Sequence, residues 1–194
     1  MNYPLSLSFK VLGFAPQIYV READGTLRMY VKQKLFKLKE AVTVFSDDSQ
    51  STPLYSIKAD RVFDFNAEYG ITTADGAAIG AIKRHGRRSL FSAHYDIKRG
   101  DEVVASIKEE NAWVRFLEAL LAQIPLVGFV AVMLLNPTYL ITRADGTLLL
   151  KVKKMPAFFE GKFEVSQHGQ MTADEETRVL TALLMMTLME RARG

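Results

Sequence analysis

Two clusters of basic side chains are the part of the sequence whose residue types and spacing suggest chemistry. One cluster surrounds Leu35-Phe36 and a denser one surrounds Gly86. The members expected to bind an anion are Lys32, Lys34, Lys83, Arg84, His85, Arg87 and Arg88. In a strand, side chains two positions apart share a face, so Lys32 and Lys34 would point the same way. A glycine-centred loop can present guanidinium groups and backbone amides to a phosphate.

These clusters allow two interpretations. Each basic residue near an anionic membrane surface contributes about 1 kcal/mol to binding, which favours an anionic phospholipid or phosphoinositide headgroup as the ligand. The alternative is a solubilising outer face, which is the commoner use of lysine on a protein surface.

Signals for catalysis or metal binding are weak. Ser92, His94 and Asp96 would share one face of a strand, but residues two apart stand side by side and do not place a base between nucleophile and orienting acid. A solvent-facing polar row is the better interpretation. His85 and His168 look isolated, and no spacing resembles a zinc or calcium site. We therefore expect no catalytic residues, no metal, no cofactor and no enzymatic activity.

Composition narrows the class of partner. The 194 residues suffice for one domain with a large core. Lys and Arg number 25 against 22 Asp and Glu, and this net charge of +3 is too balanced to indicate a nucleic-acid-binding protein. The chain has no cysteine, which fits a reducing compartment. The first residues lack the basic and apolar regions of a signal peptide, so we expect a cytoplasmic protein.

Antiparallel strands are the elements that would have to position these residues. Leu5, Leu7 and Phe9 alternate with serines, which predicts a half-buried strand. The tripeptide Ala-Asp-Gly separates β-rich runs three times, at Ala23-Asp24-Gly25, Ala74-Asp75-Gly76 and Ala144-Asp145-Gly146. Asp-Gly in this setting predicts a hairpin with a type I′ turn. The full pattern predicts a mainly β protein of about twelve strands, closed into an antiparallel barrel that has no free edge.

The C-terminal stretch from Met171 to Arg191 predicts a hydrophobic helix. Thr172 and Glu175 have the spacing of a capping box. From Val179 to Met189 only two threonines interrupt the apolar residues, so the helix is apolar all round and must be enclosed. The apolar run is well short of the roughly twenty residues that a membrane span needs. We therefore expect the barrel to surround this helix.

A second apolar stretch, at about 111–135, is expected to be a helical insert. It could pack on the barrel, form a dimer interface or touch a membrane surface. A membrane-spanning role is disfavoured because Arg115 and Glu118 would lie near the apolar zone. The side chains expected at an interaction surface are Trp113, Phe116, Leu126, Val127, Phe129 and Leu134.

In this order, the segments resemble the LURP-one-related proteins, relatives of the phospholipid scramblases within the Tubby C-terminal-like superfamily. The similarity lies in 29–45, 79–97, 158–163 and the C-terminal helix, and it leaves out the 111–135 insert. The resemblance implies one Tubby C-terminal-like domain over residues 1–194, with a twelve-stranded barrel wrapped around a buried C-terminal helix. It also implies binding of membrane lipid or phosphoinositide in some superfamily members, and it transfers no site residue.

The leading hypothesis is a non-enzymatic binding module, peripheral at the membrane, that engages anionic phospholipid through the basic residues. The alternative is a protein-interaction or dimerisation scaffold that uses the 111–135 insert and forms a homo-oligomer. A small apolar ligand at the barrel mouth is a third hypothesis, disfavoured because the helix would fill the lumen. Scramblase activity is not expected, because neither apolar stretch is suited to cross a bilayer.

Overall fold

The computed structural model describes residues 1–10, 17–32, 41–60, 67–85, 94–110, 137–155 and 161–191. These residues form twelve strands followed by one helix. The strands are β1 (Leu5–Lys10), β2 (Gln17–Arg21), β3 (Leu27–Lys32), β4 (Val42–Phe45), β5 (Pro53–Ala59), β6 (Glu68–Thr73), β7 (Ala78–Arg84), β8 (His94–Arg99), β9 (Glu102–Glu109), β10 (Thr138–Arg143), β11 (Leu148–Met155) and β12 (Gly161–Gln167). The helix is α3 (Ala173–Arg191).

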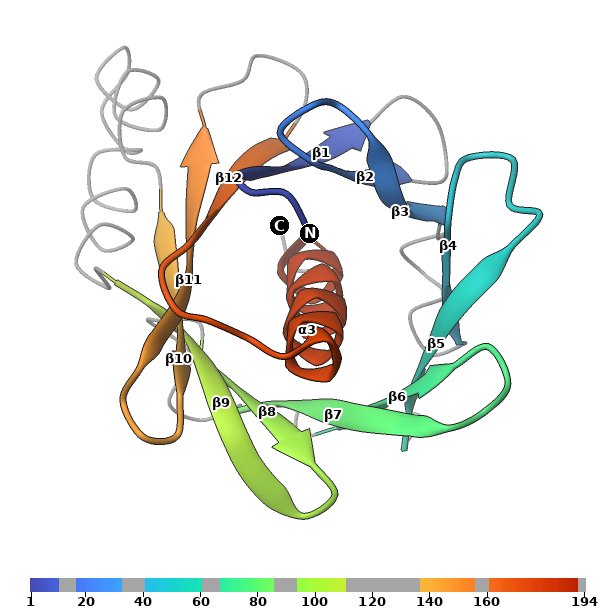
Figure 1. Cartoon of the computed structure of the whole chain (residues 1–194). Coiled ribbons are helices and arrows are strands. Elements are labelled where there is room, and N and C mark those ends of the chain that lie inside the picture. The colour runs from blue at the N-terminus through green and yellow to red at the C-terminus, as the bar shows by residue number, and fades with distance from the viewer. Residues whose placement is uncertain are drawn as a thin grey trace, which may run out of the picture.

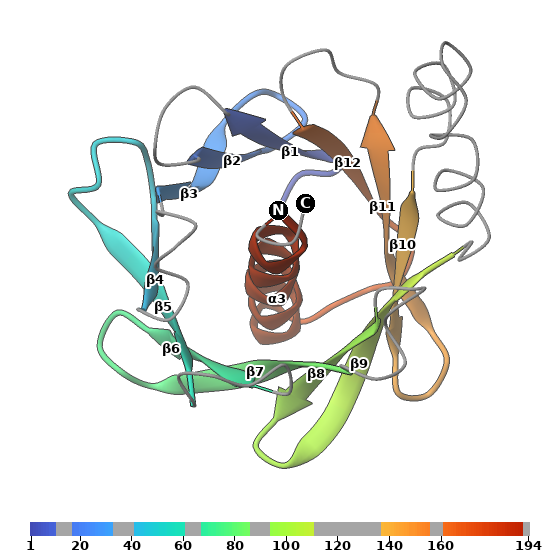
Figure 2. The same cartoon turned by 180° about the vertical axis from the view of Figure 1, so that it is seen from behind.

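The strands close into one antiparallel barrel. Each strand pairs with its neighbours in sequence, and β1 also pairs with β12, with Leu7 opposite Phe163. Figure 1 looks along the barrel with α3 at its centre, and Figure 2 shows the same arrangement from behind. The predicted mainly β, twelve-stranded closed barrel with a C-terminal helix is confirmed.

Alternation along the strands separates the core from the outer surface. In β1 the side chains of Leu5, Leu7 and Phe9 are buried, whereas Ser6 and Ser8 are only half-buried. The inward residues of the other strands join them in one hydrophobic cluster, and residues of α3 belong to the same cluster. A strand in this barrel therefore presents every second side chain to the lumen.

The three Ala-Asp-Gly hairpins form, but the predicted turn type was wrong. The glycines have positive φ, 88° at Gly25, 94° at Gly76 and 92° at Gly146, whereas the preceding aspartates do not. The amide of each glycine donates to the carbonyl three residues earlier, as from Gly25 to Glu22 at 2.9 Å. This is a type I turn followed by a left-handed glycine, and it shifts the register beside the turn. Only the glycine needs the left-handed conformation, which leaves aspartate free to cap the turn, as Asp24 Oδ1 does by accepting from the Thr26 amide at 2.9 Å.

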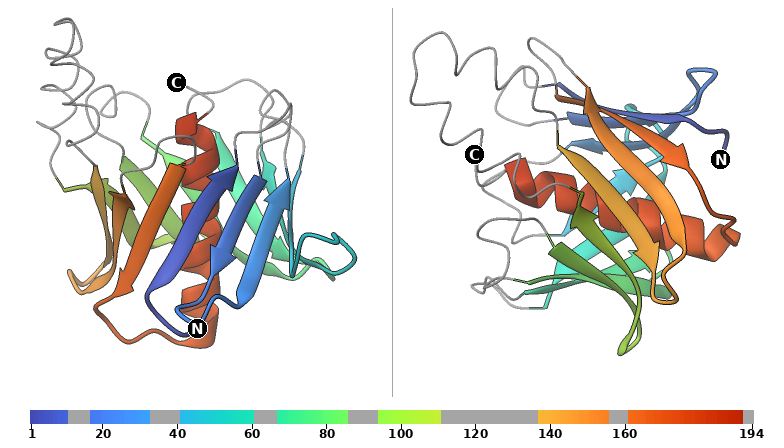
Figure 3. Two further views of the ribbon diagram at one scale, coloured as in Figure 1. Left: turned by 90° about the horizontal axis from the view of Figure 1, so that it is seen from above. Right: turned by 90° about the vertical axis from the view of Figure 1, so that its left-hand side faces the viewer.

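The two ends of the barrel differ in their connections. The odd-numbered strands all run toward one end, which we call the loop end, and every undescribed segment within the chain connects strand ends there. The other end, the turn end, has the tight turns and the start of α3. Figure 3 shows the turn end at the bottom of its left view, next to the N-terminus.

Helix α3 is apolar and buried through most of its length. From Val179 to Met189 every side chain is at most 7% exposed. The two threonines in this stretch satisfy their hydroxyl groups locally. Thr181 donates to the Thr177 carbonyl at 2.7 Å, and Thr187 donates to the Leu183 carbonyl at 2.9 Å. Back-bonding of this kind lets a hydroxyl lie in an apolar environment without an external partner.

The capping box at the start of α3 forms only in part. The Thr172 hydroxyl accepts from the Glu175 amide at 3.2 Å, as predicted. The Glu175 carboxylate instead accepts two hydrogen bonds from the Arg143 guanidinium, both at 2.8 Å. A bidentate charged pair is stronger than a single bond to a backbone amide, so this contact joins α3 to β10 and replaces half of the box.

Candidate functional site

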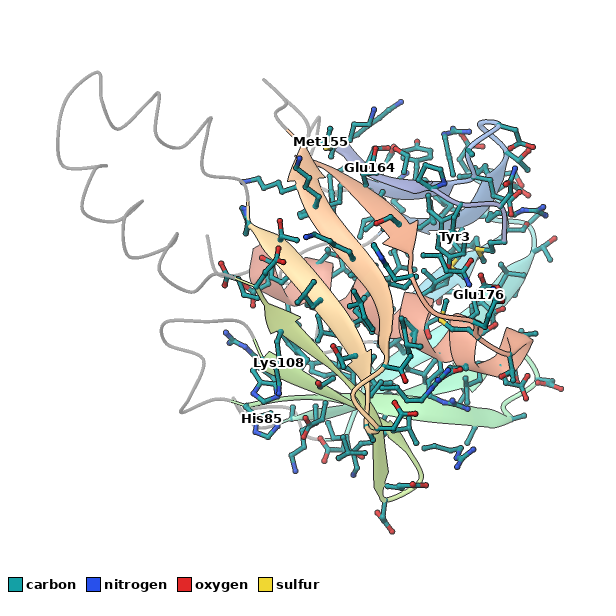
Figure 4. All side chains as sticks on the ribbon, turned by 60° about the vertical axis from the view of Figure 1, so that its left-hand side comes forward. Tyr3, His85, Lys108, Met155, Glu164 and Glu176 are labelled. Atoms are coloured by element: carbon teal, nitrogen blue, oxygen red, sulfur yellow. The ribbon has the colours of Figure 1, made fainter. Side chains whose placement is uncertain are left out.

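Exposed lysines gather at the loop end of the barrel. They project outward from the last or first residues of strands that end there, and with half-buried Lys83 they form what we call the cationic rim. Its exposed members are Lys10, Lys32, Lys58, Lys108, Lys153 and Lys162. Figure 4 shows Lys108 and His85 on the side of the loop end, with Tyr3 and Glu176 on the opposite side.

Three of these lysines lie on four adjacent strands. In the barrel order β12, β1, β2, β3, Lys10 pairs in register with Gln17, and Gln17 pairs with Lys32. On β12, the other neighbour of β1, Lys162 lies opposite Ser8. Their partners in register across these strands are uncharged, and one acid, exposed Glu164, lies two residues from Lys162 on β12.

Ion pairs distinguish the rim from the turn end. Among the described residues, none of the rim lysines forms an ion pair, and the Lys10 ammonium instead lies 5.1 Å from the Tyr19 ring centroid. Two exposed arginines near the turn end are paired, Arg28 with Glu22 at 2.9 Å and Arg99 with Glu102 at 3.3 Å. Two carboxylates of the loop end are also engaged, Glu68 by Lys98 and Glu110 by Lys151. Within the rim, Lys10, Lys32 and Lys162 therefore have neither an ion pair among the described residues nor an acidic partner in register.

The structure separates the consecutive residues Lys83, Arg84 and His85, which were expected to act together. Lys83 points outward between Glu68 and Asp96, its partners in register. Arg84 points inward and is only 6% exposed. His85 follows the end of β7 and points outward again. Strand alternation is the reason, and it excludes Arg84 from the outer surface.

Arg84 belongs to a buried polar group at the C-terminal end of α3. Its Nη2 lies 3.6 Å from Glu190 Oε1, and its guanidinium carbon lies 5.7 Å from the Tyr95 ring centroid. The Tyr95 hydroxyl donates to the same Glu190 oxygen. Burial first, and then the nearby Glu190 charge, raise the pKa of Tyr95 well above its ordinary value. The phenol is therefore neutral and remains a donor, and the group joins α3 to β7 and β8.

His85 is not isolated, contrary to the prediction from sequence. Its backbone amide donates to the His94 carbonyl at 3.0 Å, and the two imidazole rings stack with centroids 4.4 Å apart. His85 Nε2 lies 2.6 Å from Asp96 Oδ2, and His94 Nε2 lies 3.6 Å from Asp96 Oδ1. The predicted polar row therefore does place His94 and Asp96 on the outer face, but β7 adds a third side chain that spacing along one strand could not indicate.

The remaining predicted residues have different outcomes. Lys32 is exposed at the end of β3, as the rim requires. Lys34, Arg87, Arg88 and Ser92 lie outside the described residues. So do all six side chains of the expected interaction surface, Trp113, Phe116, Leu126, Val127, Phe129 and Leu134. The dimerisation alternative, which depends on these six side chains, therefore stays a prediction.

A hollow of about 330 Å³ lies between the β6–β7 turn and the first turns of α3. Its lining includes Tyr55 and Ile79, but also Thr73, Asp174 and Arg178. The Arg178 guanidinium donates to the Ile79 carbonyl at 2.8 Å. The mixed polar lining does not match the small apolar ligand considered from the sequence.

The sequence offered a signal for the rim that residue spacing along the chain did not reveal. Lys10, Lys58, Lys108, Lys153 and Lys162 are far apart in sequence, and each is a lone lysine or one of a few near a predicted strand end. In an up-and-down barrel, alternate strand ends meet at the same end. If the lysines closest to the ends of alternate predicted strands had been grouped together, the cationic rim would have been found from the sequence.

Comparison with known protein families places part of this chain in one of them. The model of the family described as LURP-one-related matches residues 27–124, just over half of the chain. The matched segment begins with β3 and extends past β9, and it contains Lys32, Lys83 and His85. No curated protein and no solved structure matches the chain. No helix among the described residues has the length and apolar character needed to cross a membrane.

Proposed function

Since this chain belongs to the LURP-one-related family, we propose that it is a non-enzymatic binding module that attaches to anionic phospholipid through the cationic rim. The loop end of the barrel would face the cytoplasmic side of the membrane, where anionic lipids are concentrated. The kinship with lipid-binding proteins of the Tubby C-terminal-like superfamily supports this choice of ligand.

The observation that carries the proposal is the lack of ion pairs at the rim. A lysine already paired with a carboxylate gains little from an anionic surface, because a partner must be given up. Lys10, Lys32 and Lys162 have no such partner among the described residues, and they lie within four consecutive strands of the barrel. At about 1 kcal/mol each, these three lysines would contribute about 3 kcal/mol, or about two orders of magnitude in membrane partitioning.

Arg84 is left out of the proposed surface. Its guanidinium is buried against Glu190 and Tyr95, so it does not reach a bilayer plane. The proposal therefore differs from the sequence-based site in using charges from many strands instead of one continuous loop.

Vesicle sedimentation tests the proposal. The double variant Lys32→Ala, Lys162→Ala should bind phosphatidylserine vesicles about thirtyfold more weakly than wild type, since two contributions of about 1 kcal/mol are lost. Binding of the wild type should also weaken as salt is added, because the Debye length falls to about 8 Å at physiological ionic strength.

The matched control is Arg28→Ala, Arg99→Ala, which removes the same net charge from residues that are exposed but already paired. It should bind like the wild type. Equal weakening in both variants would show that overall charge, not the rim, governs binding. No binding of the wild type to anionic vesicles at low salt would refute the function itself.

A further inference from the structure

The side chains of His85, His94 and Asp96 converge on the outer face of the barrel beside the ends of β7 and β8. Each is partly exposed, with side-chain exposures of 39%, 25% and 18%. One ligand atom from each side chain lies within 4.8 Å of the other two. From these observations we propose that His85, His94 and Asp96 bind a divalent ion of the zinc class.

The donor set fits this class of ion. Two neutral imidazole nitrogens and one carboxylate oxygen are ligands that Zn²⁺ takes at about 2.0–2.1 Å, and a tetrahedral site of that size separates its ligand atoms by about 3.3 Å. The His94 Nε2 to Asp96 Oδ1 distance of 3.6 Å is close to this spacing. The His85 Nε2 to Asp96 Oδ2 distance of 2.6 Å is that of a hydrogen bond. A metal ion would replace the shared proton, and a small rotation of the partly exposed His85 ring would lengthen this separation.

The backbone holds the ligands near this geometry in advance. His94 and Asp96 are two apart on β8, so their side chains leave the same face. The hydrogen bond from the His85 amide to the His94 carbonyl fixes the third ligand against them. Folding of the sheet therefore already brings the three ligands together, so metal binding itself would lose little conformational entropy.

The charges around the cluster indicate what would complete the coordination. Lys83 is the partner of Asp96 in register, and Lys108 is the partner of His94. With only one carboxylate, a bound Zn²⁺ keeps a net positive charge beside these lysines. Three protein ligands leave a fourth position open, and the surrounding charge favours an anionic oxygen over neutral water there.

Zinc titration of the full chain, without added histidine tags and after chelator treatment, tests the site. In competition with a chromophoric chelator near pH 7.5, the wild type should bind one equivalent of Zn²⁺. His85→Gln, His94→Ala and Asp96→Asn should each weaken binding at least about tenfold, the loss that even outer-shell substitutions cause. Binding should also weaken in acid, because protons compete with the metal ion for the ligands.

The control is His168→Ala, since His168 lies near the turn end, where its ring is 3.2 Å from the Ser166 hydroxyl. It should bind Zn²⁺ like the wild type, and unchanged melting temperatures should show that all variants are folded. Equal binding by wild type and the three ligand variants, equal weakening in His168→Ala, or no stoichiometric zinc on the wild type would each overturn the site. Membrane binding by the rim does not depend on this result.

Discussion

Gly80 on β7 offers the sharpest test of how α3 is seated in the barrel. A Cβ atom at this position would lie 2.4 Å from the Lys98 carbonyl oxygen of the adjacent strand. It would also lie 2.8 Å from Cδ and 3.0 Å from Cγ of Arg178 on α3. The absence of a side chain therefore lets β7 and β8 approach each other and lets Arg178 reach the Ile79 carbonyl.

Gly80→Ala should destabilise the protein. Crowding of a packed interior costs about 1–3 kcal/mol. The smaller unfolded-state entropy of alanine returns about 0.4–1 kcal/mol. The expected net loss is about 1–2 kcal/mol in the free energy of unfolding, which corresponds to a melting temperature lower by about 2–8 °C for a chain of this length.

Urea unfolding followed by circular dichroism measures this loss, with Gly70→Ala as the matched control on β6. A Cβ at Gly70 would meet only the Lys58 carbonyl oxygen, at an ordinary 3.9 Å, so this variant should equal or slightly exceed the wild type in stability. Gly80→Ala should remain destabilising in an Arg178→Ala background, because the backbone contact with Lys98 persists there. Equal stability of the two glycine variants, within about 0.5 kcal/mol, would refute the predicted close approach.

Two further predictions concern α3. Leu183→Ala removes a side chain that is 0% exposed and should cost about 2–5 kcal/mol in unfolding free energy, whereas Val103→Ala, at a side chain 41% exposed, should change it by less than about 0.5 kcal/mol. Glu175→Gln should cost about 1.5 kcal/mol at neutral pH, because the Arg143 hydrogen bonds hold the pKa of this carboxyl below its ordinary value of 4.5. A carboxyl group whose pKa is lowered by folding stabilises the folded protein at pH values above its ordinary pKa. This stabilisation is lost as the pH falls through the pKa of the group in the folded protein. Urea unfolding should therefore show that the unfolding free energies of wild type and Glu175→Gln converge in acid. A difference that stayed constant down to about pH 2 would contradict this linkage. Glu164→Gln, at an exposed position, is the control.

Local patterns carried much of the architecture. The alternation in Leu5, Leu7 and Phe9 predicts a strand wherever it occurs, because a pleated chain exposes its two faces in turn. The Ala-Asp-Gly tripeptides located three hairpins, although not their turn type, which depends on the register between the paired strands. Thr172 located the start of α3, because its hydroxyl acts on an amide only three residues away.

The candidate sites depend instead on which strands become neighbours. Lys83, Arg84 and His85 are consecutive, yet alternation sends Arg84 into the lumen and the other two outward. Lys10 and Lys32 belong to the same part of the rim only because β1 and β3 both pair with β2. His85 lies next to Asp96 only because β7 pairs with β8.

The sequence by itself therefore determined the strands, their order and the apolar character of the last helix, since each follows from residues within a few positions of one another. Only the tertiary structure decided which charges share a surface and which are buried. Those relations are set by barrel closure and strand register, and neither is encoded in the spacing of residues along a single strand.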